Sequence, residues 1–214
     1  MGPWRGVGHC NAARDTILSM STPRIVAIVP AAGRSTRMGT AKQLLAVRGR
    51  PMLLGVLDAL HTGGADEVVL VTHSQLRDQL GILPRDVRIA FNDDAGSTMI
   101  DSVRIGMDAA PACDGYLVCP ADAAGITADD VRRCAAAFHA SPYLIIIAGH
   151  DGRRGHPVFF PHALAEVVRS RECDPGLNKL ARSRPEVVRV IPCGASALAN
   201  VNTREDYDRL GAGA

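Results

Sequence analysis

The sequence predicts an α/β fold, a single three-layer domain around a mostly parallel sheet. Two observations predict it. Short apolar runs rich in β-branched residues alternate with stretches whose apolar residues recur at helical spacing. No internal repeat, block of like charge or Gly/Ser linker divides the 214 residues, a length that one α/β domain commonly holds. Strands that alternate with helices need crossover connections, and these make neighbouring strands parallel.

The first strand is expected at residues 24–30, where a continuous apolar run follows Pro23. Folded structure should therefore begin near residue 23, so we expect a flexible N-terminal extension at 1–22 and one domain at 23–214. Further strands are expected at 67–72, 87–91, 115–119, 143–148 and 187–191. Helices are expected at 51–61, 97–110 and 127–140. Thr127 and Thr203 each precede an aspartate by three positions, the spacing of a helix start.

Composition excludes several classes of protein. Lys and Arg number 24 and Asp and Glu 22, so the net charge of +2 gives no large field that would steer the chain to nucleic acid. The longest apolar runs fall far short of the roughly 20 residues that cross a bilayer. The first nineteen residues lack the apolar stretch of a secretory signal, and the six scattered cysteines are typical of reduced, mostly buried thiols. We expect a cytoplasmic protein.

One loop concentrates small residues and cations. After the first strand the chain reads Pro-Ala-Ala-Gly-Arg-Ser-Thr-Arg-Met-Gly-Thr-Ala-Lys-Gln-Leu-Leu over residues 30–45. Ala31, Ala32 and Gly33 let backbone N–H groups approach a ligand closely, and loops at the carboxyl ends of parallel strands bind ligands in open α/β sheets. The spacing matches neither the dinucleotide motif nor the P-loop. A phosphate-binding loop of another kind is therefore expected.

Lysine usage marks one position in this loop. The chain has 22 arginines and two lysines, Lys42 and Lys179. A compact ammonium follows a phosphate oxygen as its charge grows, whereas a guanidinium imposes a planar fork. Alternatively, Arg34, Arg37 and Lys42 only solvate a surface loop. The three charges alone do not decide between these interpretations.

Residues 30–45 resemble the signature of the MobA/MocA-like nucleotidyltransferases of the molybdenum cofactor, A-A-G-x-S-x-R-M-G-x-x-K-x-L-L, and the resemblance covers about residues 24–210. It implies a Rossmann-like nucleotidyltransferase fold and a cytidylyltransferase-like enzyme. Such an enzyme transfers CMP from CTP to a phosphorylated acceptor of the molybdopterin type and releases pyrophosphate, with Mg²⁺ as cofactor. GTP is the other nucleotide expected, and a molybdoenzyme or cofactor-insertion protein is the expected partner.

The resemblance also implies roles for individual residues. The residues implied in nucleotide binding are Ala31, Ala32, Gly33, Arg34, Arg37, Lys42 and Ser102. Those implied in catalysis are Arg37, Lys42 and Asp122, and Asp122 is also the implied Mg²⁺ ligand. The acceptor is expected to contact His156 and Asp174. A simpler interpretation also exists for four of these side chains. Ser102 could lie on a helix surface, Asp122 could cap a helix, and His156 could brace a turn. Asp174 could begin a helix at Pro175.

The chain departs from the family pattern at two points. Asp122 is followed by Ala123-Ala124-Gly125 where the family usually has x-Pro, and Asn202 stands where many relatives have Asp. A neutral amide is a poorer ligand than a carboxylate for a hard cation. Two alternatives to a cytidylyltransferase therefore stay open. One is a guanylyltransferase of the same cofactor or of another small phosphate, and the other is a non-catalytic carrier of nucleotide or cofactor.

Overall fold

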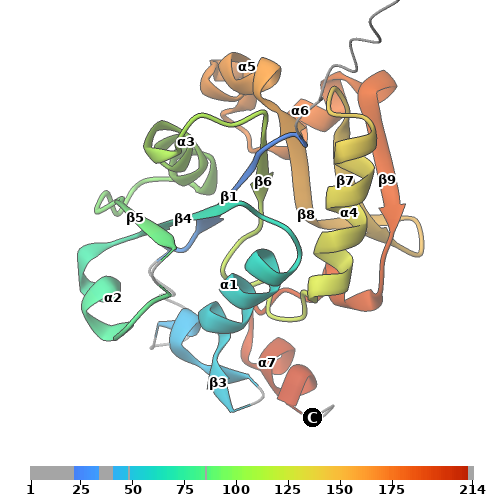
Figure 1. Ribbon diagram of the computed structural model, residues 1–214. Helices are drawn as coiled ribbons and strands as arrows, with labels where there is room; N and C mark the ends of the chain where they lie inside the picture. The colour runs from blue at the N-terminus through green and yellow to red at the C-terminus, as the bar shows by residue number, and fades with distance from the viewer. Residues whose placement is uncertain (1–21, 34–40, 48, 85, 212–214) are drawn as a thin grey trace, which may run out of the picture.

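The computed structural model describes residues 22–33, 41–47, 49–84 and 86–211. The expected N-terminal extension lies almost wholly outside these residues, as do Arg34 and Arg37. Within them the main sheet has seven strands in the order β5-β4-β1-β6-β8-β7-β9 (Figure 1). These strands are β1 (Ile25–Pro30), β4 (Glu67–Thr72), β5 (Val87–Phe91), β6 (Gly115–Val118), β7 (Ile145–His150), β8 (Arg153–Pro161) and β9 (Val188–Pro192).

The helices lie on both faces of this sheet. They are α1 (Met52–Thr62), α2 (Ser74–Gln79), α3 (Met99–Ala109), α4 (Ala128–Ala140), α5 (Ala165–Arg169), α6 (Asn178–Ser183) and α7 (Arg204–Gly211). One buried cluster joins the apolar sides of α1, α2 and α4 to one face of the sheet. A second cluster joins α3, α5 and α6 to the other face. This arrangement confirms the expected α/β fold with three layers (Figure 1).

The sheet is mostly parallel, as expected, but β8 is an exception. It runs antiparallel to β6 and to β7, and a turn at Asp151 and Gly152 joins it to β7. Arg153 and Arg154 begin β8, a strand that is not among those expected from the sequence. The missed strand opens with polar residues because its first half lines a cavity, and only Val158–Phe160 shows an apolar run.

Other boundaries moved little, with one clear error. Thr127 caps α4, since its Oγ1 accepts the backbone N–H of Asp130 at 3.2 Å, and Thr203 accepts the N–H of Asp206 in the same way. The helix that the alternative interpretation of Asp174 started at Pro175 begins instead at Asn178. Asp174 therefore is not the N-terminal carboxylate of that helix.

The packing of α3 fixes a helix that borders the site. A Cβ added to Gly106 would lie 2.4 Å from Cγ2 of Ile28 on β1, which is far inside van der Waals contact. Glycine at this position lets α3 approach the central strand closely. The approach sets the position of Ser102 one turn earlier on the same helix.

Two loops meet at the carboxyl ends of β1 and β6. The N–H of Ala121 donates to the carbonyl of Pro30 at 3.1 Å, which ties the segment after β6 to the segment after β1. The small antiparallel pair β2 (Ala46–Val47) and β3 (Arg50–Pro51) lies beyond them. In the described ranges, no helix has both the length and the apolarity to cross a membrane.

Candidate active site

Lys42 lies at the centre of a cluster of oxygen atoms. It begins the 3-10 turn η1 (Lys42–Leu44). Its Nζ donates to Asp122 Oδ2 at 2.6 Å, to the carbonyl of Val201 at 3.1 Å and to Asn202 Oδ1 at 3.5 Å. The Lys42 and Asp122 side chains are 19% and 18% exposed, so water screens this ion pair only in part. Segments 80 and 160 residues away along the chain therefore meet at one ammonium.

A first cavity begins beside this pair and has a volume of about 470 Å³. Its lining includes the expected loop residues and the ends of β1 and α3: Pro30, Ala31, Ala32, Gly33, Lys42, Gln43, Asp94, Ala95, Ser97, Thr98, Met99, Ser102, Pro120, Ala121 and Asp122. A Cβ added to Gly33 meets no described atom within 4 Å. Among the described atoms, nothing therefore blocks the close approach of a ligand to the backbone of this glycine.

Ser102 is buried at the edge of this cavity, not on an exposed helix surface. Its hydroxyl accepts a hydrogen bond from Nδ2 of the buried Asn92 at 2.9 Å, and the same nitrogen donates to Ser97 Oγ at 2.9 Å. A hydroxyl that accepts one hydrogen bond still has its own proton to donate. Asn92 thus orients Ser102 towards a donor role in the cavity.

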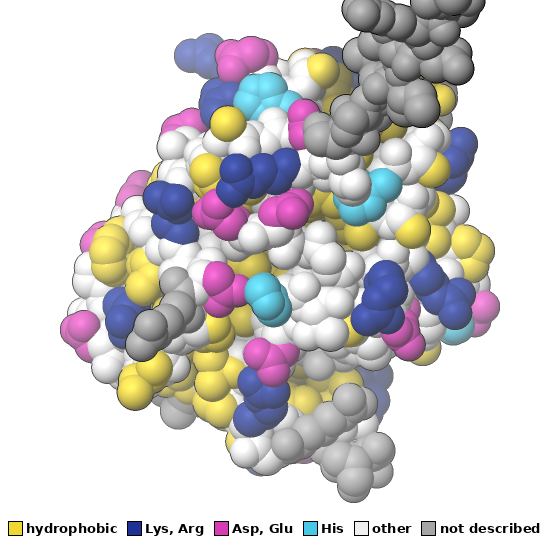
Figure 2. All heavy atoms as spheres, in the orientation of Figure 1, with side chains coloured by type: hydrophobic (Ala, Val, Ile, Leu, Met, Phe, Trp, Pro, Cys, Tyr) yellow, Lys and Arg dark blue, Asp and Glu magenta, His cyan; other side chains and the backbone are white. Residues whose placement is uncertain are grey.

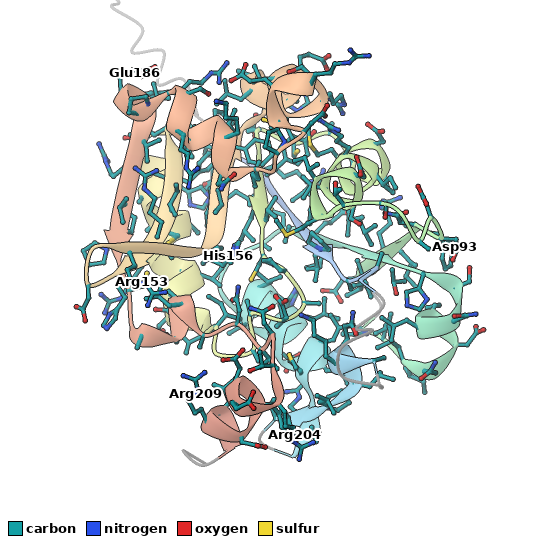
Figure 3. All side chains as sticks on the ribbon, turned by 180° about the vertical axis from the view of Figure 1, so that it is seen from behind. Asp93, Arg153, His156, Glu186, Arg204 and Arg209 are labelled. Carbon is teal, nitrogen blue, oxygen red and sulfur yellow. The ribbon has the colours of Figure 1, made fainter. Side chains whose placement is uncertain are left out.

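The second cavity is larger, at about 850 Å³, and it is rich in arginine. Its charged lining residues are Arg153 and Arg154 of β8, Arg182 of α6, and Arg209 and Asp206 of α7. Figure 3 shows His156 near the middle of this side of the molecule, with Arg153 on the hairpin and Arg209 on α7 on the same side. Four guanidinium groups against one carboxylate make this cavity attractive to an anion.

Two buried polar atoms in the second cavity have no hydrogen-bond partner among the described residues. They are Nδ1 of His156 and Oδ1 of Asn200. An unsatisfied buried polar atom costs free energy, so such atoms commonly mark the place of a ligand or of water. Burial lowers the pKa of His156, and Asp122 and a hydrogen bond with the backbone of Val118 oppose that shift. The imidazole is therefore neutral near pH 7 and acts through hydrogen bonds.

Asp174 does not join His156. Its carboxylate accepts from the Arg104 guanidinium at 2.8 Å, while the same arginine donates to the carbonyls of Val168 at 3.0 Å and Ser170 at 2.7 Å. Arg104 thus ties α3 to the chain before Pro175 and Gly176, which line the second cavity. Asp174 itself is exposed and does not line the second cavity.

The two cavities adjoin. Met99 lines both of them, and Asn202 of the second cavity contacts Lys42 of the first. Away from the cavities, cationic and acidic side chains are interspersed over the face seen in Figure 2, in keeping with the small net charge. Positive charge is thus concentrated locally at the second cavity.

Comparison with known proteins bears on this arrangement. Residues 27–188 match the family described as the MobA-like NTP transferase domain. The chain belongs to this family. A "Probable molybdenum cofactor guanylyltransferase" of Rhodopirellula baltica is 28% identical over 191 residues, which are 86% of this chain and 90% of the relative. The match places this MobA-like chain in a family of NTP transferase domains.

Other relatives of this MobA-like chain act on a different acceptor. A 2-C-methyl-D-erythritol 4-phosphate cytidylyltransferase of Frankia casuarinae is 30% identical over 173 residues, 78% of this chain and 58% of the relative. The chain spans 38% to 58% of the length of three such cytidylyltransferases. The crystal structure of Rv0371c from Mycobacterium tuberculosis superimposes with a TM-score of 0.80 at 25% identity, over 90% of this chain and all of that one. Rv0371c was also solved in complex with manganese.

Sequence reasoning missed several residues of these cavities. Gln43 occupies a variable position of the signature, so the resemblance gives it no role. Asn92 and Asn200 lie in segments that resemble elements of the family, but the resemblance gives neither side chain a role. Arg182 and Arg209 come from helices distant from β8 in the sequence, and no local pattern joins them to it.

Proposed function

We propose that this protein transfers CMP from CTP to a phosphorylated acceptor of the molybdopterin type and releases pyrophosphate. One observation carries the proposal: a cavity lined by small residues adjoins an arginine-rich cavity at the cluster of Lys42, Asp122 and Asn202. The first cavity would hold the nucleotide, with Ser102 near the base. The second would hold the acceptor, with His156 as a neutral hydrogen-bonding group. The junction is where the two phosphates would meet.

The chemistry needs little more than positioning and neutralisation of charge. An acceptor phosphate oxygen attacks the α-phosphorus of CTP, so a new P–O bond forms and the bond from that phosphorus to the β-phosphate oxygen breaks. The electron pair leaves with pyrophosphate. The nucleophile is already ionised at pH 7, so no general base is required. The ammonium of Lys42 lies where negative charge would grow. Arg34 and Arg37 are also proposed to bind the nucleotide, although both lie outside the described residues.

The donor set at the junction fits a hard divalent cation. Three oxygens, from Asp122, Val201 and Asn202, already converge on the positive charge of Lys42 Nζ. Oxygen donors with at least one carboxylate are the ligands that Mg²⁺ prefers, and phosphate oxygens and water complete its shell. Asp122 would hold the ion, and Asn202 is the nearest neutral donor. Bound Mg²⁺ supplies further neutralisation of charge on the phosphates.

One set of assays, in which each nucleoside triphosphate is paired with each acceptor, tests the specificity for base and acceptor. We expect pyrophosphate release with CTP and molybdopterin to exceed release with GTP, ATP or UTP, and to exceed release with 2-C-methyl-D-erythritol 4-phosphate as acceptor. The reason for the second preference is the volume of about 850 Å³ and the four arginines of the second cavity, which suit a large acceptor with more than one anionic group. A preference for GTP would make the protein a guanylyltransferase, and turnover with the small phosphate alone would reject the molybdopterin assignment.

The arginine wall gives a prediction about the acceptor. Arg154→Ala and Arg182→Ala should each raise the KM for molybdopterin by about tenfold or more, because a hydrogen bond to a charged group contributes about 1.5–3 kcal/mol. The KM for CTP should stay unchanged, as neither residue lines the first cavity. Initial rates measured against each substrate separately give both constants.

Arg132→Ala is the matched control, because this arginine is an exposed residue of α4 that pairs with Asp129. It should leave both KM values as they are. If the KM for molybdopterin is also unchanged in both cavity variants, the acceptor does not bind against this wall.

A further inference from the structure

Gln43 is a buried polar residue in the wall of the first cavity. It follows Lys42 in the turn η1 and is 2% exposed. Its Nε2 donates to the carbonyl of Ala31 and to the carbonyl of Gly33, each at 2.9 Å. Both partners are acceptors only, so the amide must face them with its NH₂ group. The chemistry of the partners thus fixes the orientation of the side chain.

The two hydrogen bonds determine how the loop presents its backbone. In a trans peptide the carbonyl and the following N–H point in opposite directions. Because Gln43 holds the carbonyl of Ala31, the N–H of Ala32 points away from the Gln43 amide. The start of the segment is fixed separately, since the N–H of Ala31 donates to the carbonyl of Val71 at 2.7 Å. The neighbouring strand therefore fixes the N–H of Ala31, and Gln43 fixes the peptide groups that follow it.

We propose that Gln43 is a positioning residue that sets the peptide groups of Ala31–Gly33 for binding the nucleotide phosphates. The proposal rests on the proposed function, in which this cavity holds the nucleotide. It adds a role for a side chain whose neighbour, Lys42, supplies the charge. In this proposal the short turn η1 places the ammonium of Lys42 near the phosphates and the neutral amide of Gln43 against the loop.

Gln43→Met tests the proposal, because methionine keeps the length and volume of the side chain and removes both donors. Two lost hydrogen bonds should raise the KM and the Kd for CTP roughly 5- to 100-fold. The KM for the acceptor should stay within about twofold, since the loop borders only the first cavity. Gln43→Glu is the second variant: it keeps a polar side chain of the same size but presents oxygen to the two carbonyls, and it should weaken CTP binding at least as much.

Gln79→Met is the matched control. Gln79 also donates its Nε2 to a backbone carbonyl, that of Gln75 at 3.0 Å, but it lies on α2 outside both cavities. It should change neither constant. An unchanged KM for CTP in Gln43→Met, or an equal rise in both KM values with a fall in melting temperature, would overturn the positioning role.

A second readout separates this proposal from the proposed function. A crystal structure of ligand-free Gln43→Met should show the Ala31–Ala32 peptide turned from its wild-type orientation. Retention of that orientation would overturn the role of Gln43 whatever the protein binds. A wild-type protein that binds no nucleotide, with a turned peptide in the variant, would instead reject the proposed function and leave the brace itself established.

Discussion

Lys42→Ala is expected to lower the rate of nucleotidyl transfer by about 30- to 900-fold, equivalent to ~2–4 kcal/mol of lost transition-state stabilisation. The reason is the position of its ammonium, which contacts Asp122, Val201 and Asn202 at the junction of the two cavities. Single-turnover rates with saturating CTP and acceptor measure the effect on the chemical step.

Two further variants make the Lys42 prediction specific. Lys179→Ala removes the other lysine, an exposed residue of α6, and should leave the rate unchanged. Lys42→Arg restores the positive charge, but its planar fork cannot reproduce the contacts of a compact ammonium, so activity should return only in part. A Lys42→Ala enzyme with a near-normal rate would assign this lysine to structure alone.

The metal gives the second large effect. Asp122→Asn should raise the Mg²⁺ concentration needed in the presence of CTP by about tenfold or more, because a unit charge near the ion contributes about 1–4 kcal/mol. Asn202→Asp should give equal or tighter Mg²⁺ binding, since Asn202 Oδ1 lies 3.5 Å from the ammonium that Asp122 also contacts. A calorimetric titration of the protein–CTP complex with Mg²⁺ measures both changes in affinity without turnover.

Asp108→Asn serves as the control for the metal variants, because this exposed carboxylate pairs with Arg169 away from the junction. It should not alter the Mg²⁺ titration. An Asp122→Asn protein with wild-type Mg²⁺ affinity would reject the metal assignment. Weaker binding in Asn202→Asp would contradict the prediction that a carboxylate at this position helps to hold the ion.

The fold could be predicted largely from the sequence because its central strands are buried on both faces. Strand β1 is fully buried along its length, so it appears as an unbroken apolar run. Strand β8 lacked such a run in its first half, where Arg153 to His156 face a cavity, and it was therefore missed. Apolar periodicity reports burial, and it is silent where a strand meets a ligand site.

The candidate site could be predicted only where one segment carries it. The signature located Lys42 and the Ala31–Gly33 loop because they are close in the sequence. The approach of Asn202 to Lys42 spans 160 residues, and no local pattern contains it. The partners of Ser102 and Gln43 were likewise invisible, because a hydrogen bond to a distant or backbone group leaves no mark on composition.

The central claim is that this protein moves a nucleotide onto an acceptor phosphate. The direct measurement incubates wild-type protein with CTP labelled at the α-phosphate, Mg²⁺ and molybdopterin, and then follows the label. We predict that the label leaves CTP and appears in a product that joins CMP to the acceptor phosphate, with one pyrophosphate released per product. Label that remains in CTP while CTP and molybdopterin both bind would show a non-catalytic carrier, and label released as free CMP would show hydrolysis; either result would contradict the account.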